Sequence, residues 1–371
     1  MIAEISALQR RLGHADANPG HDWLNLVENV PQWPDPPGLP AAPAGTPFGY
    51  APSQGHPALI EALVKRERTV SAAAHVDEAN VLVTAGGIHA IGLVLRELAA
   101  LGHHRALHAT PVFIGVHDLM RAAGMTPRAL PLTGTPDDLP LLLAHVDGPT
   151  VVYLNLPHNP TGAVLSPGLL PVLRELAAHP DVFVLYDAVY DSFDFRSAPC
   201  PAPVDLAVSG PRMAVVNSAS KSLGRPGERV GWVVAAEGVI AGLVPRLEWE
   251  IVSVNGAAQH AVAAALTAGN APLVDAVRRG RAAFARAVAG TRLDTPLPPG
   301  GSQLWMDLGV GDVEAFADFA LHRHHLVLTT SANYAPALPG HIRFPTGMPE
   351  ELIRRSLAVL ADALDDWERR S

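Results

Sequence analysis

Short apolar runs alternate with helical patterns along the middle of the chain. The first such unit, NVLVTAGGIHAIGLVLRELAALG at 80–102, passes from an apolar run through Gly86 and Gly87 into a helical period. Similar apolar runs that end in polar residues or glycine occur in HRALHATPVF, TVVYLNLPHNPTG, DVFVLYDAVYD, RMAVVNSASKS and RVGWVVAA. Runs of this kind are typical of buried, mostly parallel strands. The pattern predicts an α/β fold whose polar strand ends meet at one edge of the sheet.

The two ends of the chain follow other patterns. The first 45 residues are rich in proline and lack sustained periodicity, as in VPQWPDPPGLPAAPAGTP, which indicates an arm lying over the rest of the protein. Helices are predicted at 57–69 and at 257–290, and the second should lead into a smaller C-terminal α+β unit. We therefore expect an arm at 1–45 that is part of the small domain, a large domain at 46–255 and the small domain at 256–371.

Composition narrows the class of protein. Of the 371 residues, 48% are hydrophobic and 17% charged, as in an ordered globular protein, and the net charge of −9 argues against a nucleic-acid surface. Cys200 is the only cysteine, so internal disulfides and a cysteine-rich metal site are excluded. The opening MIAEISALQRRLGH lacks a signal-peptide core, and no run approaches the roughly 18 apolar residues of a membrane span. We expect a cytoplasmic protein whose partners are small molecules or other subunits.

One lysine stands out in the segment SASKSLGRPGERVGW at 218–232. The chain has 27 lysines and arginines, of which only Lys65 and Lys221 are lysines. An amine in a partly desolvated site loses proton affinity and forms an imine with an aldehyde, which arginine cannot do because it stays protonated. A surface lysine is the simpler explanation, but the near-total use of arginine elsewhere weakens it. The sequence therefore marks Lys221 as a candidate nucleophile.

A candidate phosphate site lies in the same region. Arg229 offers a rigid fork of donors, and Ser218 and Ser220 lie on the same loop. Gly86 and Gly87 stand between a strand and a helix, where bare backbone amides meet anions. The alternative is a tight turn plus a salt bridge for Arg229.

Other polar residues at the strand ends suit an aromatic cofactor ring. Asp187 ends the run VFVLYD, where a buried carboxylate needs a partner such as a pyridinium nitrogen. Tyr190 and Asn159 could bond a ring oxygen, and Phe113 could stack on the ring. Taken singly, each of these residues is more often structural.

Together these motifs make the chain resemble the fold-type I pyridoxal-phosphate enzymes, specifically the class I/II aminotransferases. The resemblance covers nearly all the chain and rests on SxSK followed after eight residues by arginine, with NPTG, DAVY and IRF in the same order. It implies a mostly parallel, seven-stranded type of sheet in a large domain that binds pyridoxal 5'-phosphate, beside a smaller α+β domain. It also implies transfer of the amino group of an α-amino acid to a 2-oxo acid.

The resemblance assigns a role to each candidate. Lys221 would carry the cofactor as an aldimine and shuttle the proton, Asp187 would hold the pyridine nitrogen protonated, and Tyr190 would bond the phenolic oxygen. Asn159 would share that oxygen, and Phe113 would stack on the ring. The phosphate would be bound by the glycine turn and the serine loop, namely Gly86, Gly87, Ile88, Ser218, Ser220 and Arg229.

Further motifs concern the substrate and the subunit arrangement. Arg343, in HIRF, matches the arginine that binds the substrate α-carboxylate. Tyr50 matches the tyrosine that reaches the phosphate of the neighbouring subunit, which implies a homodimer with shared active sites. Two departures border the substrate: Asn29 in NVP replaces a glycine, and the loop TTSANYAPALPG differs from the usual pattern. Asn29 is therefore a candidate substrate-binding residue. Asn159 is a second candidate.

Alternatives remain at this point. Relatives with the same constellation act as lyases, cyclases, decarboxylases or oxidases on amino acids, because the outcome depends on which substituent stands perpendicular to the ring. Some transcription factors fuse this fold to a DNA-binding domain, but the arm motif here already begins near Trp23. The histidine clusters GHHRALH and LHRHHLVL lack partnering cysteines or carboxylate spacing, so no metal site is expected.

Overall fold

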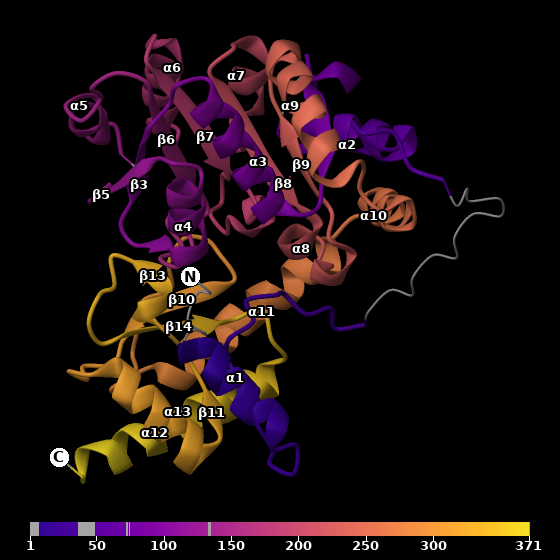
Figure 1. The fold of residues 1–371 in the computed structure, drawn as a ribbon. Helices are drawn as coiled ribbons and strands as arrows, with labels where there is room; N and C mark the ends of the chain where they lie inside the picture. The colour runs from indigo at the N-terminus through magenta and orange to yellow at the C-terminus, as the bar shows by residue number, and fades with distance from the viewer. Residues whose placement is uncertain (1–6, 36–48, 72, 74, 133–134, 371) are drawn as a thin grey trace.

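A seven-stranded sheet forms the centre of the molecule (Figure 1). The computed structural model describes residues 7–35, 49–71, 73, 75–132 and 135–370. The strand order is β2-β9-β8-β7-β6-β3-β5, and β9 runs antiparallel to both of its neighbours, whereas the other pairs are parallel. The strands are β2 (Val81–Thr84), β3 (Arg105–Ala109), β5 (Thr126–Leu130), β6 (Thr150–Asn155), β7 (Val182–Asp187), β8 (Met213–Ser218) and β9 (Gly231–Val234).

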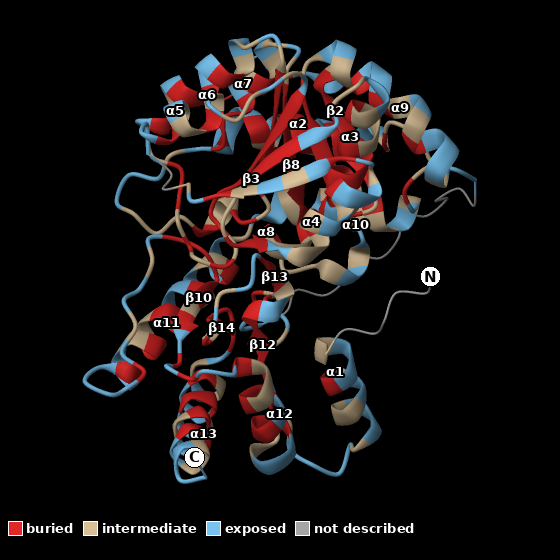
Figure 2. Cartoon of the chain, turned by 60° about the vertical axis from the view of Figure 1, so that its left-hand side comes forward, coloured by how far each residue is buried: buried red, intermediate tan, exposed pale blue. Residues whose placement is uncertain are grey.

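Helices cover both faces of this sheet and explain why its strands are continuously apolar. Every residue of β6, β7 and β8 is buried. Alternate side chains enter different cores, since Val152 packs with one helical layer and Val151 with the other. The first layer holds α2 (Pro57–Val70), α5 (Asp138–Leu143), α6 (Leu169–Ala178) and α7 (Val204–Ser209), and the second holds α3 (Gly87–Ala100), α4 (Ile114–Ala122) and α9 (Glu237–Ile251). Figure 2 shows the buried residues gathered in the sheet and on the inner faces of the helices.

A second unit is built from the C-terminal part of the chain. Its sheet has the order β10-β14-β12, with β10 (Gln303–Asp307) and β12 (Thr329–Thr330) antiparallel to β14 (His341–Pro345). A separate core, which includes Phe284, Phe316 and Phe344, joins this sheet to α11 (Ala271–Val288), α12 (Val313–His324) and α13 (Glu350–Glu368). The N-terminal segment contacts this unit, because β1 (Leu24–Asn25) pairs with β11 (Leu326–Val327).

The α/β fold with a mostly parallel sheet is confirmed, and so are the predicted strands and the helix at 57–69. Strand β5 was not predicted, because Pro127 and Arg128 interrupt its apolar pattern. The domain boundaries at 45 and 255 stay a prediction. Every described helix is too short or too polar to cross a membrane.

One expectation about the helices was wrong, and one helix was not predicted. The helix expected at 257–290 is two helices, α10 (Gly256–Ala268) and α11, because Gly269 adopts φ +80° and ends the first. The arm also contains α1 (Ala7–Ala17), which lacked an obvious apolar stripe. Its buried Arg11 donates to Asp318 on α12 at 2.7 Å, so a distant ion pair holds this helix in place. The later part of the arm, 36–48, lies outside the described residues.

Candidate active site

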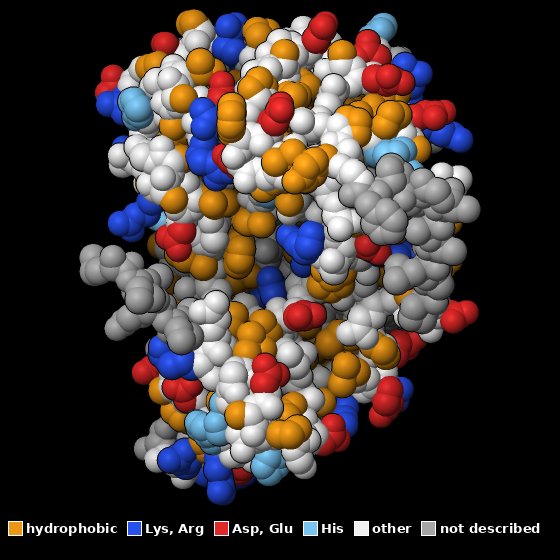
Figure 3. All heavy atoms as spheres, turned by 45° about the vertical axis from the view of Figure 1, so that its right-hand side comes forward, with side chains coloured by type: hydrophobic (Ala, Val, Ile, Leu, Met, Phe, Trp, Pro, Cys, Tyr) orange, Lys and Arg blue, Asp and Glu red, His pale blue; other side chains and the backbone are white. Residues whose placement is uncertain are grey.

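A cavity of about 440 Å³ lies where the carboxyl ends of β6, β7 and β8 face the arm and β14. This volume suits a cofactor with a small substrate. Figure 3 shows the hollow from one side, with Lys or Arg side chains inside it and at its rim. The structure brings most of the expected residues together here, namely Asn29, Gly87, Ile88, Phe113, Asn159, Asp187, Tyr190, Ser218, Ser220, Lys221, Arg229 and Arg343.

Lys221 lies on α8 (Ala219–Ser222), a single helical turn directly after β8. Its Nζ donates a hydrogen bond of 3.0 Å to the backbone carbonyl of Asn29. Burial lowers the pKa of this amine to about 8, and the positive charges of Arg343 and Arg229 act in the same direction. A large fraction of Lys221 is therefore neutral in mildly alkaline solution, which is the form that attacks an aldehyde.

Asp187 is buried at the end of β7. Its carboxylate accepts hydrogen bonds from the hydroxyl of Tyr153 at 2.6 Å and from the backbone N–H of Val189 at 3.1 Å. Burial raises the pKa of Asp187 to about 6, although these bonds oppose the rise. Within the described chain no cationic side chain pairs with this carboxylate. A protonated pyridine nitrogen is the kind of group that would complete it.

The glycine turn and the serine loop form one compact corner. Gly86, at φ +93°, precedes α3, and a Cβ added there would lie 2.5 Å from the guanidinium of Arg229. Ser218 donates to the hydroxyl of Ser220 at 2.9 Å. The amides at the N-terminus of the 14-residue helix α3 thus stand beside an arginine and two hydroxyls, which is an arrangement that suits a phosphate. Gly86 shapes this corner but does not line the cavity itself.

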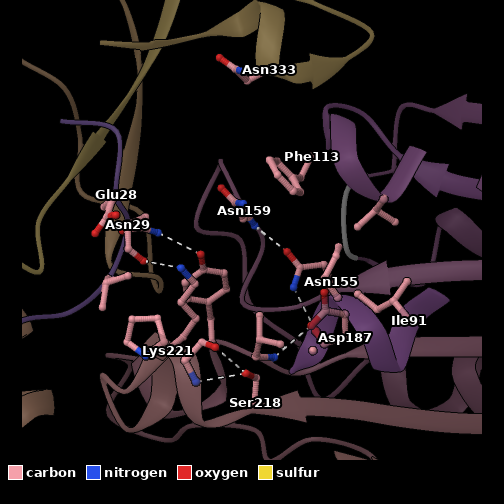
Figure 4. A pocket seen from close by; sticks show the side chains of 18 of the residues that line it. Glu28, Asn29, Ile91, Phe113, Asn155, Asn159, Asp187, Ser218, Lys221 and Asn333 are labelled. Carbon is pink, nitrogen blue, oxygen red and sulfur yellow. Dashed lines mark hydrogen bonds between the residues drawn. The ribbon is translucent and has the colours of Figure 1, made fainter. Parts of the chain in front are cut away.

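A hydrogen-bonded wall holds the residues expected around the ring (Figure 4). Tyr334 donates to Oδ1 of Asn159 at 3.1 Å, and the backbone N–H of Asn159 donates to Asn155 at 2.8 Å. Strand β13 (Tyr334–Ala335) pairs with β4 (Val112–Phe113), which sets Tyr334 opposite Phe113. The loop TTSANYAPALPG, which departs from the usual family pattern, therefore packs against the side of the cavity that carries Phe113.

Asn29 is buried in a polar network at the other side of the cavity. Its Nδ2 donates to Gln303 at 2.6 Å and to the hydroxyl of Tyr190 at 3.1 Å, and its Oδ1 accepts from Ser302 at 3.0 Å. Because Tyr190 accepts this bond, its own proton remains free to donate into the cavity. The side chain of Asn29 is engaged within the protein, and its predicted contact with substrate stays a prediction.

Arg343 points into the cavity from β14 and is only 8% exposed. It donates from Nη2 to the carbonyl of Val27, whereas its buried Nε has no hydrogen-bond partner in the described structure. A buried, unsatisfied guanidinium N–H is costly. An incoming carboxylate would satisfy it, which fits the expected contact with the substrate α-carboxylate.

Some residues that line the cavity were not found from sequence, and one expected residue lies elsewhere. Tyr50 is 85% exposed and does not line this cavity. Tyr153 and Asn155, which bond Asp187, and Glu28, which lines the cavity, were missed. The alternation of Tyr153 and Asn155 at the end of an apolar strand was the available signal. The sequence around Glu28 contains no motif that distinguishes it from an ordinary surface glutamate.

The histidine clusters do not form a metal site in the described part of the chain, where no group of three or more suitable side chains meets. The ring centroids of His21 and His325 lie 4.2 Å apart, with the ring planes tilted by 36°. His108 and His117 share a hydrogen bond of 3.2 Å.

Comparison with known proteins gives consistent matches over the whole chain. The family described as Aminotransferase class I and II matches residues 21–360. The 3-methylarginine biosynthesis aminotransferase ArgM of Streptomyces arginensis is 37% identical over 99% of this chain and 98% of its own length. The L-aspartate:5-guanidino-3-methyl-2-oxopentanoate transaminase of Pseudomonas syringae pv. syringae is 34% identical over 98% and 95%. The aspartate aminotransferase of Thermotoga maritima has the same fold, with a TM-score of 0.86, 22% identity and 97% coverage of both chains.

Proposed function

The chain belongs to the class I and II aminotransferases, which are pyridoxal-phosphate-dependent enzymes, and from that premise we propose that it transaminates a substrate of the arginine type. The substrate pair would be a 2-oxo acid that carries a terminal guanidino group and the corresponding α-amino acid. Amino-group transfer itself follows from the family and from the aminotransferases to which this chain is similar.

The observation that carries the substrate class is the shared chemistry of two relatives. The names of both describe amino or oxo acids with a guanidino group, and both align over at least 98% of this chain. Matches over the full length include every part of the cavity wall, from the arm to β14.

The residues of the cavity fit the cofactor, and we assign their roles accordingly. When bound, pyridoxal phosphate supplies an aldehyde and a ring that withdraws electrons. Lys221 would hold the aldehyde through its amine and would carry the proton that the reaction moves. Asp187 would keep the ring nitrogen protonated, and Phe113 would pack on the ring face. Tyr190 and Asn159 would donate to the phenolic oxygen. The phosphate would be bound by Gly87, Ile88, Ser218, Ser220 and Arg229 around the turn at Gly86.

Arg343 orients the substrate for this chemistry. Its unpaired Nε and its fixed Nη2 would hold the α-carboxylate of the substrate. A carboxylate held in this way would leave the Cα–H bond, and not the bond to the carboxylate, aligned for cleavage, which favours removal of the proton over loss of the carboxylate. Transamination is supported in preference to decarboxylation.

We also propose a homodimer with shared sites and a cytoplasmic location. The support for the dimer is the match of Tyr50 to the tyrosine that reaches the neighbouring subunit in this family, and its exposure of 85% leaves it available to a partner. The single cysteine is consistent with a reducing compartment.

A screen of acceptors tests the substrate class. The enzyme loaded with pyridoxal phosphate is given L-aspartate or L-glutamate together with 5-guanidino-2-oxopentanoate, pyruvate or 2-oxoglutarate. We expect formation of L-arginine with a higher kcat/KM than that of any product without a guanidino group. Equal or better use of the small oxo acids, with no arginine formed, would contradict the proposal.

A further inference from the structure

One of the two carboxylates that line the cavity has no partner of opposite charge, either in the protein or in the groups that the cofactor and the α-carboxylate would supply. The lining contains three cations, Lys221, Arg229 and Arg343, and two carboxylates, Asp187 and Glu28. Arg229 faces the phosphate corner, Arg343 suits the α-carboxylate, and Asp187 suits the ring nitrogen. Glu28 makes no hydrogen bond or ion pair in the described chain. Its side chain is therefore available to a group outside the cofactor and the common part of an amino acid.

The backbone fixes Glu28 at a central place in the site. The carbonyl of Val27 accepts from Arg343, and the carbonyl of Asn29 accepts from Lys221 at 3.0 Å. Residue 28 thus lies between the group that binds the α-carboxylate and the reacting amine. The charge of Glu28 is near enough to oppose the fall in the pKa of Lys221.

The neighbours of Glu28 prevent this segment from moving away. Leu26 donates its backbone N–H to Val327 at 2.9 Å, and the buried side chain of Asn29 bonds to Gln303 and Ser302. Figure 4 shows Glu28 beside Asn29, across the cavity from Phe113. Glu28 itself is solvent-exposed at the mouth of the cavity, so it can meet the far end of a long side chain whose Cα is held near Lys221.

We propose that Glu28 determines substrate specificity by binding the guanidinium group of the substrate side chain, an inference that rests on the proposed function. A guanidinium next to Arg343 and Lys221 would otherwise be repelled by both. The carboxylate of Glu28 removes that repulsion and matches the planar donor fork of a guanidinium.

The test compares a cationic substrate with its neutral isostere. Transfer of the amino group from L-arginine, L-citrulline and L-alanine is followed in wild type, Glu28→Gln and Glu28→Asp. We expect Glu28→Gln to lower kcat/KM for arginine by about tenfold, mainly through KM, and to leave citrulline and alanine within about twofold. Glu28→Asp should restore part of the preference for arginine. Glu175→Gln, on the exposed side of α6, is the matched control and should change none of these values.

A binding measurement separates recognition from turnover. The non-reacting analogue 5-guanidinopentanoate should raise the melting temperature of the wild-type holoenzyme more than 5-ureidopentanoate does. Glu28→Gln should abolish that difference. An equal response of wild type and Glu28→Gln to both ligands would overturn the inference.

The outcomes distinguish this inference from the proposed function. If wild type uses arginine and Glu28→Gln uses it equally well, the role of Glu28 is wrong and the proposed function stands. If wild type rejects guanidino substrates but uses lysine or ornithine in a Glu28-dependent way, the substrate class is wrong and the role of Glu28 in binding a cation stands. If wild type uses no amino acid with a cationic side chain, both fail.

Discussion

The hydroxyl of Tyr153 donates a 2.6 Å hydrogen bond to the carboxylate of Asp187 deep in the sheet. This bond orients a buried carboxylate that has no cationic partner among the described residues, and burial raises the pKa of Asp187 to about 6. The negative charge of Asp187 therefore has no positive counterpart among the described residues. A cationic ring nitrogen would supply that counterpart.

The first prediction concerns the stability of the cofactor-free protein. The pKa of Asp187 is higher in the folded chain than its ordinary value of 3.8, so the folded state binds more protons between those two values. Stability contributed by this group is present below about pH 4 and is lost as pH rises through about 6. Asp187→Asn should therefore stabilise the cofactor-free protein by about 2 kcal/mol at pH 7.5 and by much less at pH 4.

Urea unfolding of both proteins at the two pH values measures this difference. The same variant should lose most of its catalytic rate when loaded with cofactor, because asparagine cannot hold the ring nitrogen protonated. A stability gain that is the same at pH 4 and pH 7.5 would refute the electrostatic explanation.

The second prediction concerns the reactivity of Lys221. Burial and the charge of Arg343 lower the pKa of the amine from its ordinary value of 10.5 to about 8. The rate at which the cofactor-free protein captures pyridoxal phosphate should rise about tenfold per pH unit below pH 7 and level off above pH 8. Stopped-flow absorbance gives this profile. Arg343→Gln removes one cation and should move the plateau to higher pH, and an unmoved profile would count against this cause.

The third prediction concerns the network of Asn29. Asn29→Ala removes the bonds to Tyr190, Gln303 and Ser302 and leaves buried polar groups without partners. We expect a loss of about 2–3 kcal/mol in the free energy of unfolding. Asn25→Ala, at an exposed position of the same arm, is the control and should cost less than about 1 kcal/mol. Equal losses in the two variants would show that the network contributes little to stability.

The fourth prediction tests shared active sites. If Tyr50 acts in the site of the partner subunit, Tyr50→Phe and Lys221→Ala should each have low activity alone. An equal mixture of the two, dissociated and reassembled, should recover up to about a quarter of the wild-type rate, because about half of its dimers are hybrids and one of the two sites in each hybrid is intact. Reassembled mixtures with no recovered activity, or a fully active monomer by light scattering, would exclude this arrangement.

The sequence predicted the groups at the strand ends because an apolar strand that stops at a polar residue is a local signal. Asp187 and Ser218 end such strands, and Lys221 follows one of them. Tyr153 was hidden because a tyrosine inside an apolar run looks like core, and its role depends on the pairing of β6 with β7.

Other features depend on contacts between distant segments and leave no local trace. Glu28 acquires its place only because Val27 and Asn29 meet Arg343 and Lys221, which are far away along the chain. The helix α1 depends in the same way on the ion pair of Arg11 with α12. The end of α10 at Gly269 could have been predicted from the sequence, because a glycine inside a predicted helix often marks a helix end.

A single-turnover measurement tests the central claim most directly. Purified protein loaded with pyridoxal phosphate is mixed with L-arginine in the absence of any 2-oxo acid, and the cofactor spectrum and the products are followed together. We predict one equivalent of 5-guanidino-2-oxopentanoate per site, conversion of the cofactor to its amine form and then arrest, with no such product from Lys221→Ala. Repeated turnover without an acceptor, release of carbon dioxide, or an unchanged spectrum with L-arginine would contradict the account.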